Sequence, residues 1–191
     1  MKSLCYFSEN LIIPEIALNV YTTKYQAYQI NKIIKTFIPT DSVVTDATAG
    51  IGGNSLFFIK DFRRVNLIEK DPDMYKILIK NTKLENRVNI SSYNCSYNYI
   101  KFMLIQDLVF FDPPWGGQDY KNKKKINLFL DGINVIDIIN DIYNFTKIVA
   151  LKIPNNFDTS RFDNSFWYNK IFNIVKGKKT VYKLIIFYKP I

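Results

Sequence analysis

Hydrophobic positions change their spacing several times along the chain, and this predicts strands that alternate with helices. Apolar and aromatic residues recur at close to helical intervals between Lys24 and Phe37. Other apolar stretches are short and nearly continuous, which is typical of parallel strands buried on both faces. The expected strands cover residues 42–47, 65–71, 88–94, 106–112, 147–153 and 180–189, and further helices are expected at 54–62, 72–84 and 131–143. This alternation predicts a mostly parallel sheet with helices on both faces, a doubly wound α/β fold.

Helix boundaries and chain length predict a single domain. Asn54 stands where a helix N-cap is expected, and Pro72 suits the first position of the following helix. The 191 residues contain no internal repeat, no low-complexity block and no stretch typical of a linker. We therefore expect one domain over residues 1–191, with a helical segment at 1–40 and the core at 41–191.

The lack of histidine limits the possible chemistry. Both Ser-His-Asp and Cys-His nucleophile systems are excluded, and so is a Cys/His zinc site. Cys5 and Cys95 are single and distant in sequence, so a disulfide framework is not expected. We expect no metal, and any reaction has to use carboxylates, amides, hydroxyls and an imported cofactor.

The charge of the chain favours a polyanionic partner. The formal net charge is +9, and lysines cluster at Lys121–Lys125 and at Lys176, Lys178 and Lys179. A basic excess on a small domain favours nucleic acid, although a generally lysine-rich composition is the alternative. The sequence has no run of eighteen apolar residues and no signal-peptide pattern. We therefore expect an intracellular, soluble protein of the cytoplasm or nucleus, without a membrane partner.

Polar or glycine-rich segments follow four of the expected strands. The first strand runs into "DATAGIGGN", the second reaches Glu69, the third reaches Asn94, and the fourth runs into "DPPW". In α/β sheets of this kind ligands bind outside the carboxyl ends of the strands. These four segments are therefore expected to converge on one edge of the sheet.

The first of these turns differs from a dinucleotide-binding turn because an acid, Asp46, precedes its glycines. An acid at that place would repel a pyrophosphate but suits a ligand with an ammonium or sulfonium centre. Glu69, about twenty residues further on, is well placed to accept hydrogen bonds from both hydroxyls of a ribose. Helix capping or surface charge is the alternative role for both acids.

The segment "FDPPWGGQDYK" leaves the fourth strand with an unusual composition. Its two prolines have no N–H to donate to a sheet, and Gly116 and Gly117 permit backbone angles that a Cβ would block. A strand exit followed by a turn is one explanation. Trp115, however, is flanked by prolines and glycines, which favours a functional role over a place in the core.

In the strings "DATAGIGGNSLFF", "IEKDP" and above all "DPPWGGQDY", the chain resembles class I S-adenosylmethionine-dependent methyltransferases, and among them the trimethylguanosine synthase family. That family methylates N2 of 7-methylguanosine RNA caps. The resemblance spans roughly Thr22 to the C-terminus. It implies a Rossmann-like, seven-stranded sheet, S-adenosyl-L-methionine as cofactor with S-adenosyl-L-homocysteine as product, 7-methylguanosine-capped RNA as partner, and a monomer.

The resemblance also implies roles for individual residues. The two acids that hold the cofactor fall on Asp46 and Glu69, the cap-stacking tryptophan falls on Trp115, and the tyrosine on the phosphate side falls on Tyr120. The implied cofactor-binding residues are Thr22, Asp46, Ala47, Gly50, Gly52, Asn54, Glu69, Lys70, Asn94 and Asp112; the substrate-binding residues are Phe7, Trp115, Tyr120 and Asn155; the catalytic residues are Asp112, Pro113 and Trp115.

Three positions depart from the family pattern. Asp112 stands where the family usually has serine, Asn94 where it usually has an acid near the adenine amino group, and Asn155 where it has an arginine. An acid before two prolines is also found in adenine-N6 methyltransferases, which are one alternative. Guanine-N2 methylation of internal ribosomal RNA and a non-catalytic cap-binding module are two others.

Overall fold

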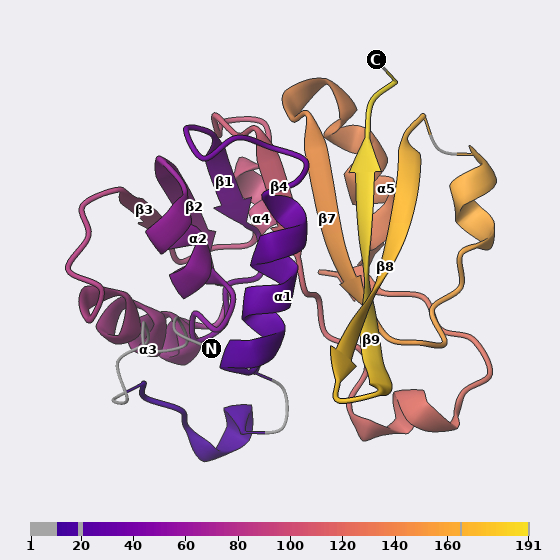
Figure 1. The fold of residues 1–191 in the computed structure, drawn as a ribbon, viewed down its shortest axis with the longest axis horizontal. Coiled ribbons are helices and arrows are strands. Elements are labelled where there is room, and N and C mark those ends of the chain that lie inside the picture. Colours follow the sequence, from indigo (N-terminus) through magenta and orange to yellow (C-terminus); the bar gives the residue numbers. More distant parts are fainter. Residues whose placement is uncertain (1–10, 19–20, 165, 191) are drawn as a thin grey trace.

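The computed structural model describes residues 11–18, 21–164 and 166–190. At its centre is a seven-stranded sheet with the strand order β3-β2-β1-β4-β7-β9-β8 (Figure 1). The strands are β1 (Val43–Asp46), β2 (Arg64–Ile68), β3 (Ile90–Tyr93), β4 (Leu108–Phe111), β7 (Ile148–Ile153), β8 (Tyr168–Lys176) and β9 (Lys179–Tyr188), and a separate antiparallel pair is formed by β5 (Phe129–Leu130) and β6 (Ile133–Asn134).

The strands β3, β2, β1, β4 and β7 run parallel, whereas β9 is antiparallel to both β7 and β8. Parallel strands need crossover connections, and helices provide most of them here. The helices are α1 (Lys24–Ile34), α2 (Ser55–Asp61), α3 (Pro72–Lys83), α4 (Tyr97–Ile100) and α5 (Val135–Asp141), with short 3₁₀ turns η1 (Glu15–Ala17), η2 (Gln118–Asn122), η3 (Tyr143–Phe145) and η4 (Ser160–Asn164).

Neighbouring residues of the central strands pack into two different cores. Successive side chains of a strand point to opposite faces, and the fully buried rings of Phe110 and Phe111 in β4 follow this rule. Phe110 packs in a core with residues of α1, α2 and α3, whereas Phe111 packs in a core with residues of α4 and α5. Helices therefore cover both faces of a mostly parallel sheet, and the expected doubly wound α/β fold is confirmed.

The short elements α4, β5 and β6 were not expected, and two further differences have a clear physical reason. The strand β8 was not expected, because this edge strand is mostly exposed and lacks a continuous apolar run. The helix expected at 131–143 is limited to α5, because Asp131 and Gly132 adopt positive φ angles of 54° and 79° in the turn between β5 and β6.

The expected helix ends are partly correct. Pro72 occupies the first position of α3, and Asp71 caps that helix by accepting hydrogen bonds from the backbone N–H groups of Asp73 and Met74. Asn54 precedes α2, but its backbone is helical, with φ −87° and ψ −40°, and its side chain makes no capping hydrogen bond. The expected capping role of Asn54 is therefore wrong, and its amide has a different partner, described below.

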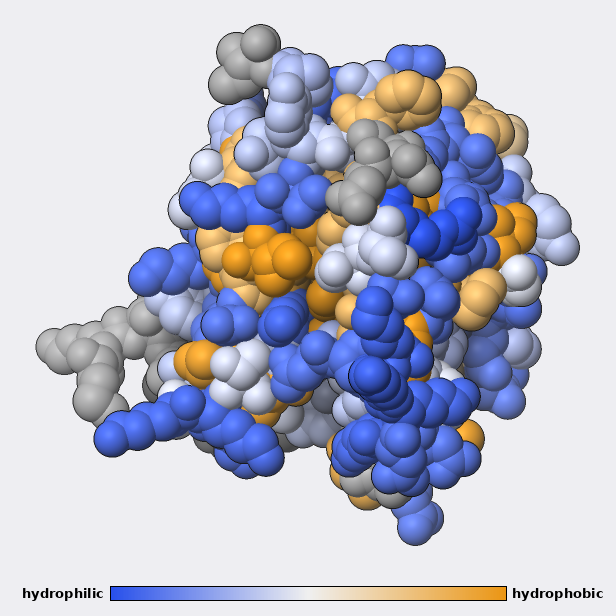
Figure 2. Space-filling model, turned by 90° about the vertical axis from the view of Figure 1, so that its right-hand side faces the viewer, coloured by the Kyte–Doolittle hydropathy of each residue, from blue (hydrophilic) through white to orange (hydrophobic). Residues whose placement is uncertain are grey.

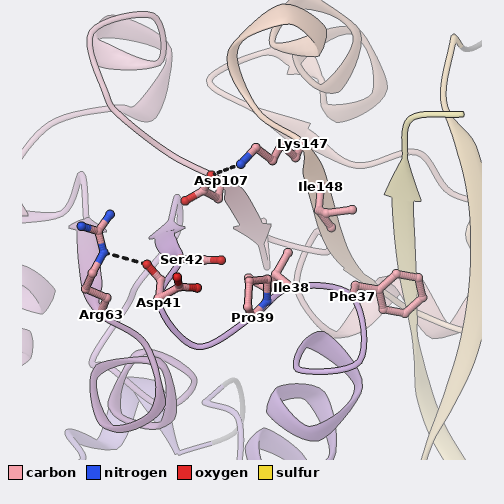
Figure 3. A pocket seen from close by; sticks show the side chains of 9 residues that line it. All are labelled: Phe37, Ile38, Pro39, Asp41, Ser42, Arg63, Asp107, Lys147 and Ile148. Carbon is pink, nitrogen blue, oxygen red and sulfur yellow. Dashed lines mark hydrogen bonds and ion pairs between the residues drawn. The ribbon is translucent and has the colours of Figure 1, made fainter. Parts of the chain in front are cut away.

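A hollow of about 440 Å³ opens at the amino ends of β1, β4 and β7 (Figure 3). Three of its charged side chains, those of Lys147, Asp107 and Arg63, bind each other or the backbone. Lys147 forms an ion pair with Asp107 at 2.8 Å, and Arg63 Nε donates to the backbone oxygen of Asp41 at 2.7 Å. Ligands of such sheets bind at the opposite, carboxyl edge, so we place the functional site there.

Candidate active site

Four strand exits meet at one edge of the sheet, as the sequence predicts. This is the edge toward which the β7 arrow points in Figure 1, and β3, β2, β1 and β4 all end there as parallel neighbours. Hydrogen bonds join the exits of β2 and β3. Asn94 Nδ2 donates to the backbone oxygens of Glu69 and Lys70 at 2.8 and 3.2 Å.

Asp46 ends β1 and lies under the glycine-rich turn. Its side chain is buried, and its Oδ2 accepts a hydrogen bond of 2.6 Å from the Ser55 hydroxyl on α2. Burial raises the pKa of Asp46 from 3.8 to about 7, and the Ser55 hydrogen bond opposes this rise. The Asp46 carboxyl therefore gains or loses its proton near neutral pH, and a cationic ligand bound beside it would favour the ionised carboxylate.

Glu69 fastens the glycine-rich turn to the end of β2. Its two carboxylate oxygens accept hydrogen bonds of 2.7 Å from the backbone N–H groups of Gly50 and Asp71. Burial raises the pKa of Glu69 as well. Gly50 has a φ of 54°, and a Cβ built on it would meet no atom within 4 Å, so the turn has open space above it.

The hydroxyl of Thr22 joins the segment before α1 to three other parts of the site. Asn54 Nδ2 donates to this hydroxyl at 3.0 Å, and Lys152 Nζ donates to it at 2.9 Å. The hydroxyl itself donates to Asp112 Oδ2, at 3.4 Å. Thr22 and Asn54 were both predicted as site residues, and the structure brings them together.

Asp112 follows β4 and forms an ion pair that the sequence does not predict. Its Oδ2 lies 2.7 Å from Lys152 Nζ, and its backbone N–H donates to the Thr48 hydroxyl at 2.7 Å. Lys152 lies inside β7 and is 4% exposed. Its sequence signal is a single charged residue within the apolar run "KIVALKI", since lysine is rarely buried without a partner.

Trp115 is half-buried between two tyrosine rings. The ring centroids of Tyr120 and Tyr182 lie 5.2 and 5.9 Å from that of Trp115, both edge to face. The ammonium of Lys152 lies 4.6 Å from the Tyr182 ring and 5.3 Å from the Trp115 ring. Tyr182 was not predicted as a site residue, because it belongs to β9, far along the chain.

The loop after Trp115 is held from the exit of β7. Asn156 Nδ2 donates to the backbone oxygens of Tyr120 and Lys123 at 2.7 and 2.8 Å. Gly116 and Gly117 have φ angles of 88° and 74°, which confirms that this loop requires the glycine-only region. Asn155, the predicted phosphate contact, is exposed, and its Nδ2 donates to the backbone oxygen of Thr180 at 3.4 Å.

The remaining predicted residues occupy varied places. Lys70 follows β2, but its side chain is paired with Asp131 at 2.5 Å. Ala47 continues the sheet by donating its N–H to the Phe110 oxygen at 2.9 Å, and Pro113 is buried. Gly52 has a φ of 99°, and a Cβ there would lie 3.2 Å from Leu78. Phe7 lies outside the described residues.

The donors and acceptors of this edge suit S-adenosylmethionine. Carboxylates at Asp46 and Glu69 match its cationic centres and ribose hydroxyls, and the open space above Gly50 gives it access. Within the part of the chain described by the structure, no three His, Cys, Asp or Glu side chains are grouped to hold a metal ion. In the same residues no helix is both long and apolar enough to cross a membrane.

Several solved structures have similar folds, and two of the following three are named as methylating enzymes of RNA. A protein described as an RNA methyltransferase from Pyrococcus horikoshii is 18% identical with a TM-score of 0.67, covering 98% of this chain and 96% of its own. An rRNA methylase from Streptococcus thermophilus is 11% identical with a TM-score of 0.58, covering 84% and 94%. TYW2 from M. jannaschii, solved in complex with AdoMet, is 15% identical with a TM-score of 0.60, covering 92% and 80%. These likenesses show the fold, which is the Rossmann-like fold of class I S-adenosylmethionine-dependent methyltransferases.

The family follows from the sequence profile that matches residues 41–184. The chain belongs to the RNA cap guanine-N2 methyltransferase family. An uncharacterized protein of Acanthamoeba polyphaga mimivirus is 42% identical over 125 residues, which are 63% of this chain and 49% of the relative. The chain thus spans about half the length of that relative. The chain is therefore a member of this methyltransferase family, and its activity and substrate are proposed below.

Proposed function

We propose that the protein transfers a methyl group to N2 of guanine in the 7-methylguanosine cap of RNA. The observation that carries this proposal is the adjacency, at the exit of β4, of the Asp112 carboxylate and the half-buried ring of Trp115. The first is an acceptor for an amine, and the second is a platform for a base. Membership of the family supports guanine N2 as the acceptor atom.

When bound, S-adenosylmethionine would supply an electrophilic methyl group to the amine nitrogen, its sulfur would keep the electron pair of the broken carbon–sulfur bond, and the amine would lose a proton to solvent. Asp112 orients the amine by accepting one of its hydrogens, and the Pro113 carbonyl is a second acceptor. Holding the reacting atoms in line contributes roughly 7–11 kcal/mol to such a transfer. Asp46 and Glu69 hold the cofactor, so their alanine variants should each weaken its binding.

The base and the RNA bind on the other side of the site. A 7-methylguanine is cationic, so stacking on Trp115 adds an attraction of about 0.5–2 kcal/mol over a neutral guanine. Tyr120, Asn155 and Phe7 complete the substrate site in this proposal. Residues 1–40 then serve as the cap-pocket segment and 41–191 as the core of one domain.

Methyl transfer to a panel of acceptors tests the proposal. The protein is incubated with methyl-labelled cofactor and, in parallel, with 7-methyl-GTP, GTP, a deoxyadenosine oligonucleotide and uncapped RNA. We expect 7-methyl-GTP to acquire label faster than GTP. Equal labelling of the two would favour guanine-N2 methylation of internal RNA, and binding of 7-methyl-GTP without any labelling would favour a cap-binding module.

Adenine-N6 methylation is the second candidate, and the identity of Asp112 favours it. An aspartate before two prolines accepts the adenine amine in the same way as it would the guanine amine. Label on the deoxyadenosine oligonucleotide, with none on 7-methyl-GTP, would select this reaction.

A further inference from the structure

Lys152 is a buried cation in the middle of a strand that is otherwise apolar. All six residues of β7 are buried, and the Lys152 side chain is 5% exposed. Removing an ammonium from water costs several kcal/mol unless it is paired and hydrogen-bonded. A lysine kept at such a place therefore needs a compensating group, and the structure identifies it as Asp112.

Four side chains from three segments surround this ammonium. The Asp112 carboxylate after β4 lies 2.7 Å away, and the Thr22 hydroxyl before α1 lies 2.9 Å away. The rings of Trp115 and Tyr182 complete the surroundings at 5.3 and 4.6 Å. The acceptor motif, the N-terminal segment and the antiparallel strand β9 thus all meet at Lys152.

The hydrogen bonds at Asp112 engage its two oxygens unequally. Lys152 Nζ and the Thr22 hydroxyl both donate to Oδ2, and the Asp112 N–H is held separately by Thr48. Oδ1 makes no hydrogen bond to any residue within the described ranges, and the Asp112 side chain is 17% exposed. One oxygen is therefore anchored while the other stays available to an acceptor amine.

We propose that Lys152 is a positioning residue that anchors Asp112 through Oδ2 and so directs Oδ1 to the amine that receives the methyl group. This inference rests on the proposed methyl transfer. It also accounts for the aspartate at a position where the family usually has serine. A neutral hydroxyl needs no cation beside it, whereas an aspartate close to the buried carboxyl of Asp46 does.

Lys152 acts through Asp112 in this scheme, so a double-mutant cycle separates positioning from packing. In Lys152→Met the apolar stem is kept and the ammonium is lost. We expect kcat to fall on the order of 10- to 100-fold while KM for the acceptor changes little, because the carboxylate is no longer held in place. Asp112→Ser should keep measurable activity.

The decisive variant is Asp112→Ser combined with Lys152→Met. If the lysine serves the aspartate, the double variant should be faster than Lys152→Met and close to Asp112→Ser. If Lys152 only fills space, adding Asp112→Ser cannot recover activity, and the inference is overturned. A wild-type rate in Lys152→Met overturns it as well. Lys147→Met, at an exposed position just before β7, is the matched control and should keep the wild-type rate.

Thermal unfolding tests the pair without any substrate. Lys152→Met leaves a partly buried carboxylate without its cation and should lower Tm by roughly 5–10 °C, and Asp112→Ser in the same chain should restore most of that loss. If wild type labels adenine rather than guanine, the proposed cap function fails, and the same kinetic cycle is run on the adenine acceptor. An additive loss of Tm in the double variant would overturn the pairing whatever the acceptor is.

Discussion

Gly53 and Thr22 are packed backbone to backbone, although thirty-one positions separate them along the chain. A Cβ built on Gly53 would lie 2.9 Å from the backbone oxygen of Thr22 and 3.3 Å from its nitrogen. The glycine-rich turn can therefore approach the segment before α1 only if this position carries no side chain. The approach places the Thr22 hydroxyl within hydrogen-bonding distance of both Asn54 and Asp112.

Gly53→Ala should disrupt this arrangement. The new methyl group displaces Thr22, at a cost of about 1–3 kcal/mol in the free energy of unfolding, and should weaken cofactor binding as well. Calorimetric titration with S-adenosylmethionine and urea unfolding measure the two effects. Gly132→Ala is a control for cofactor affinity only: its positive φ of 79° makes the alanine costly to stability, but a Cβ there meets no atom within 4 Å, so the variant should retain cofactor affinity. Wild-type affinity in Gly53→Ala would contradict the role given to this contact.

The stability of the protein should fall as pH rises from about 4 to about 7. Burial raises the pKa of Asp46 from 3.8 to about 7, so within this window the folded chain holds a proton that the unfolded chain has released. The resulting loss is roughly 4 kcal/mol, and it should level off above the folded pKa. Burial also raises the pKa of Glu69, which adds in the same direction.

Asp46→Asn tests the assignment of this pH dependence. The amide keeps the shape of the carboxyl and does not titrate in this range. The difference in unfolding free energy between about pH 5 and about pH 8 should shrink clearly relative to wild type, with a smaller part remaining from Glu69. An unchanged difference would mean that Asp46 is not the group responsible.

Trp115 should act as a stacking platform for the base. Trp115→Ala should reduce the affinity for 7-methyl-GTP by roughly 1–3 kcal/mol, the usual contribution of a base–aromatic stack. Trp115→Phe should recover part of it, because the indole Nε1 has no hydrogen-bond partner among the described residues that phenylalanine would lose. Affinity for S-adenosylmethionine should stay close to wild type in both variants. If Trp115→Ala binds 7-methyl-GTP normally, the ring serves only to fill the site.

Two groups of lysines should attract the RNA chain: those of residues 121–125 in and after η2, and Lys176, Lys178 and Lys179 around the turn between β8 and β9. The turn between β8 and β9 extends past the end of β7, since Ile153 pairs with Lys183 whereas β9 begins at Lys179. The turn and η2 lie at the lower end of the molecule in Figure 1, and hydrophilic side chains gather in the lower half of the face in Figure 2. Their exposed lysines therefore lie toward the edge that carries the candidate site.

The double variant Lys178→Gln with Lys179→Gln should bind capped RNA more weakly than wild type, with unchanged affinity for 7-methyl-GTP. In a plot of the logarithm of the RNA-binding constant against the logarithm of salt concentration, the magnitude of the slope should fall by about 0.7 for each phosphate that a lysine no longer neutralises. Binding measured at several salt concentrations provides the slope. The same change at Lys80 and Lys83, exposed on the last turn of α3, is the matched control and should leave the slope unchanged. Equal effects of the two pairs would indicate nonspecific attraction.

The sequence by itself determined the fold class and the position of the strand exits. Hydrophobic spacing is local, and parallel strands bring their carboxyl ends to one edge, so the order of residues along the chain is enough to place Asp46, Glu69 and Asp112 together. The edge strand β8 was not predicted from the sequence, because a mostly exposed strand has no continuous apolar run.

Only the tertiary structure decided which side chains hold these acids in place. Lys152 is separated from Asp112 by forty positions and from Thr22 by one hundred and thirty, and Tyr182 reaches the same point from an antiparallel strand. Along the sequence, Lys152 is simply one polar residue in an apolar run. Whether such a residue faces water or a buried carboxylate depends on what the neighbouring strands and the N-terminal segment place beside it, because pairing and burial are long-range properties that local periodicity does not contain.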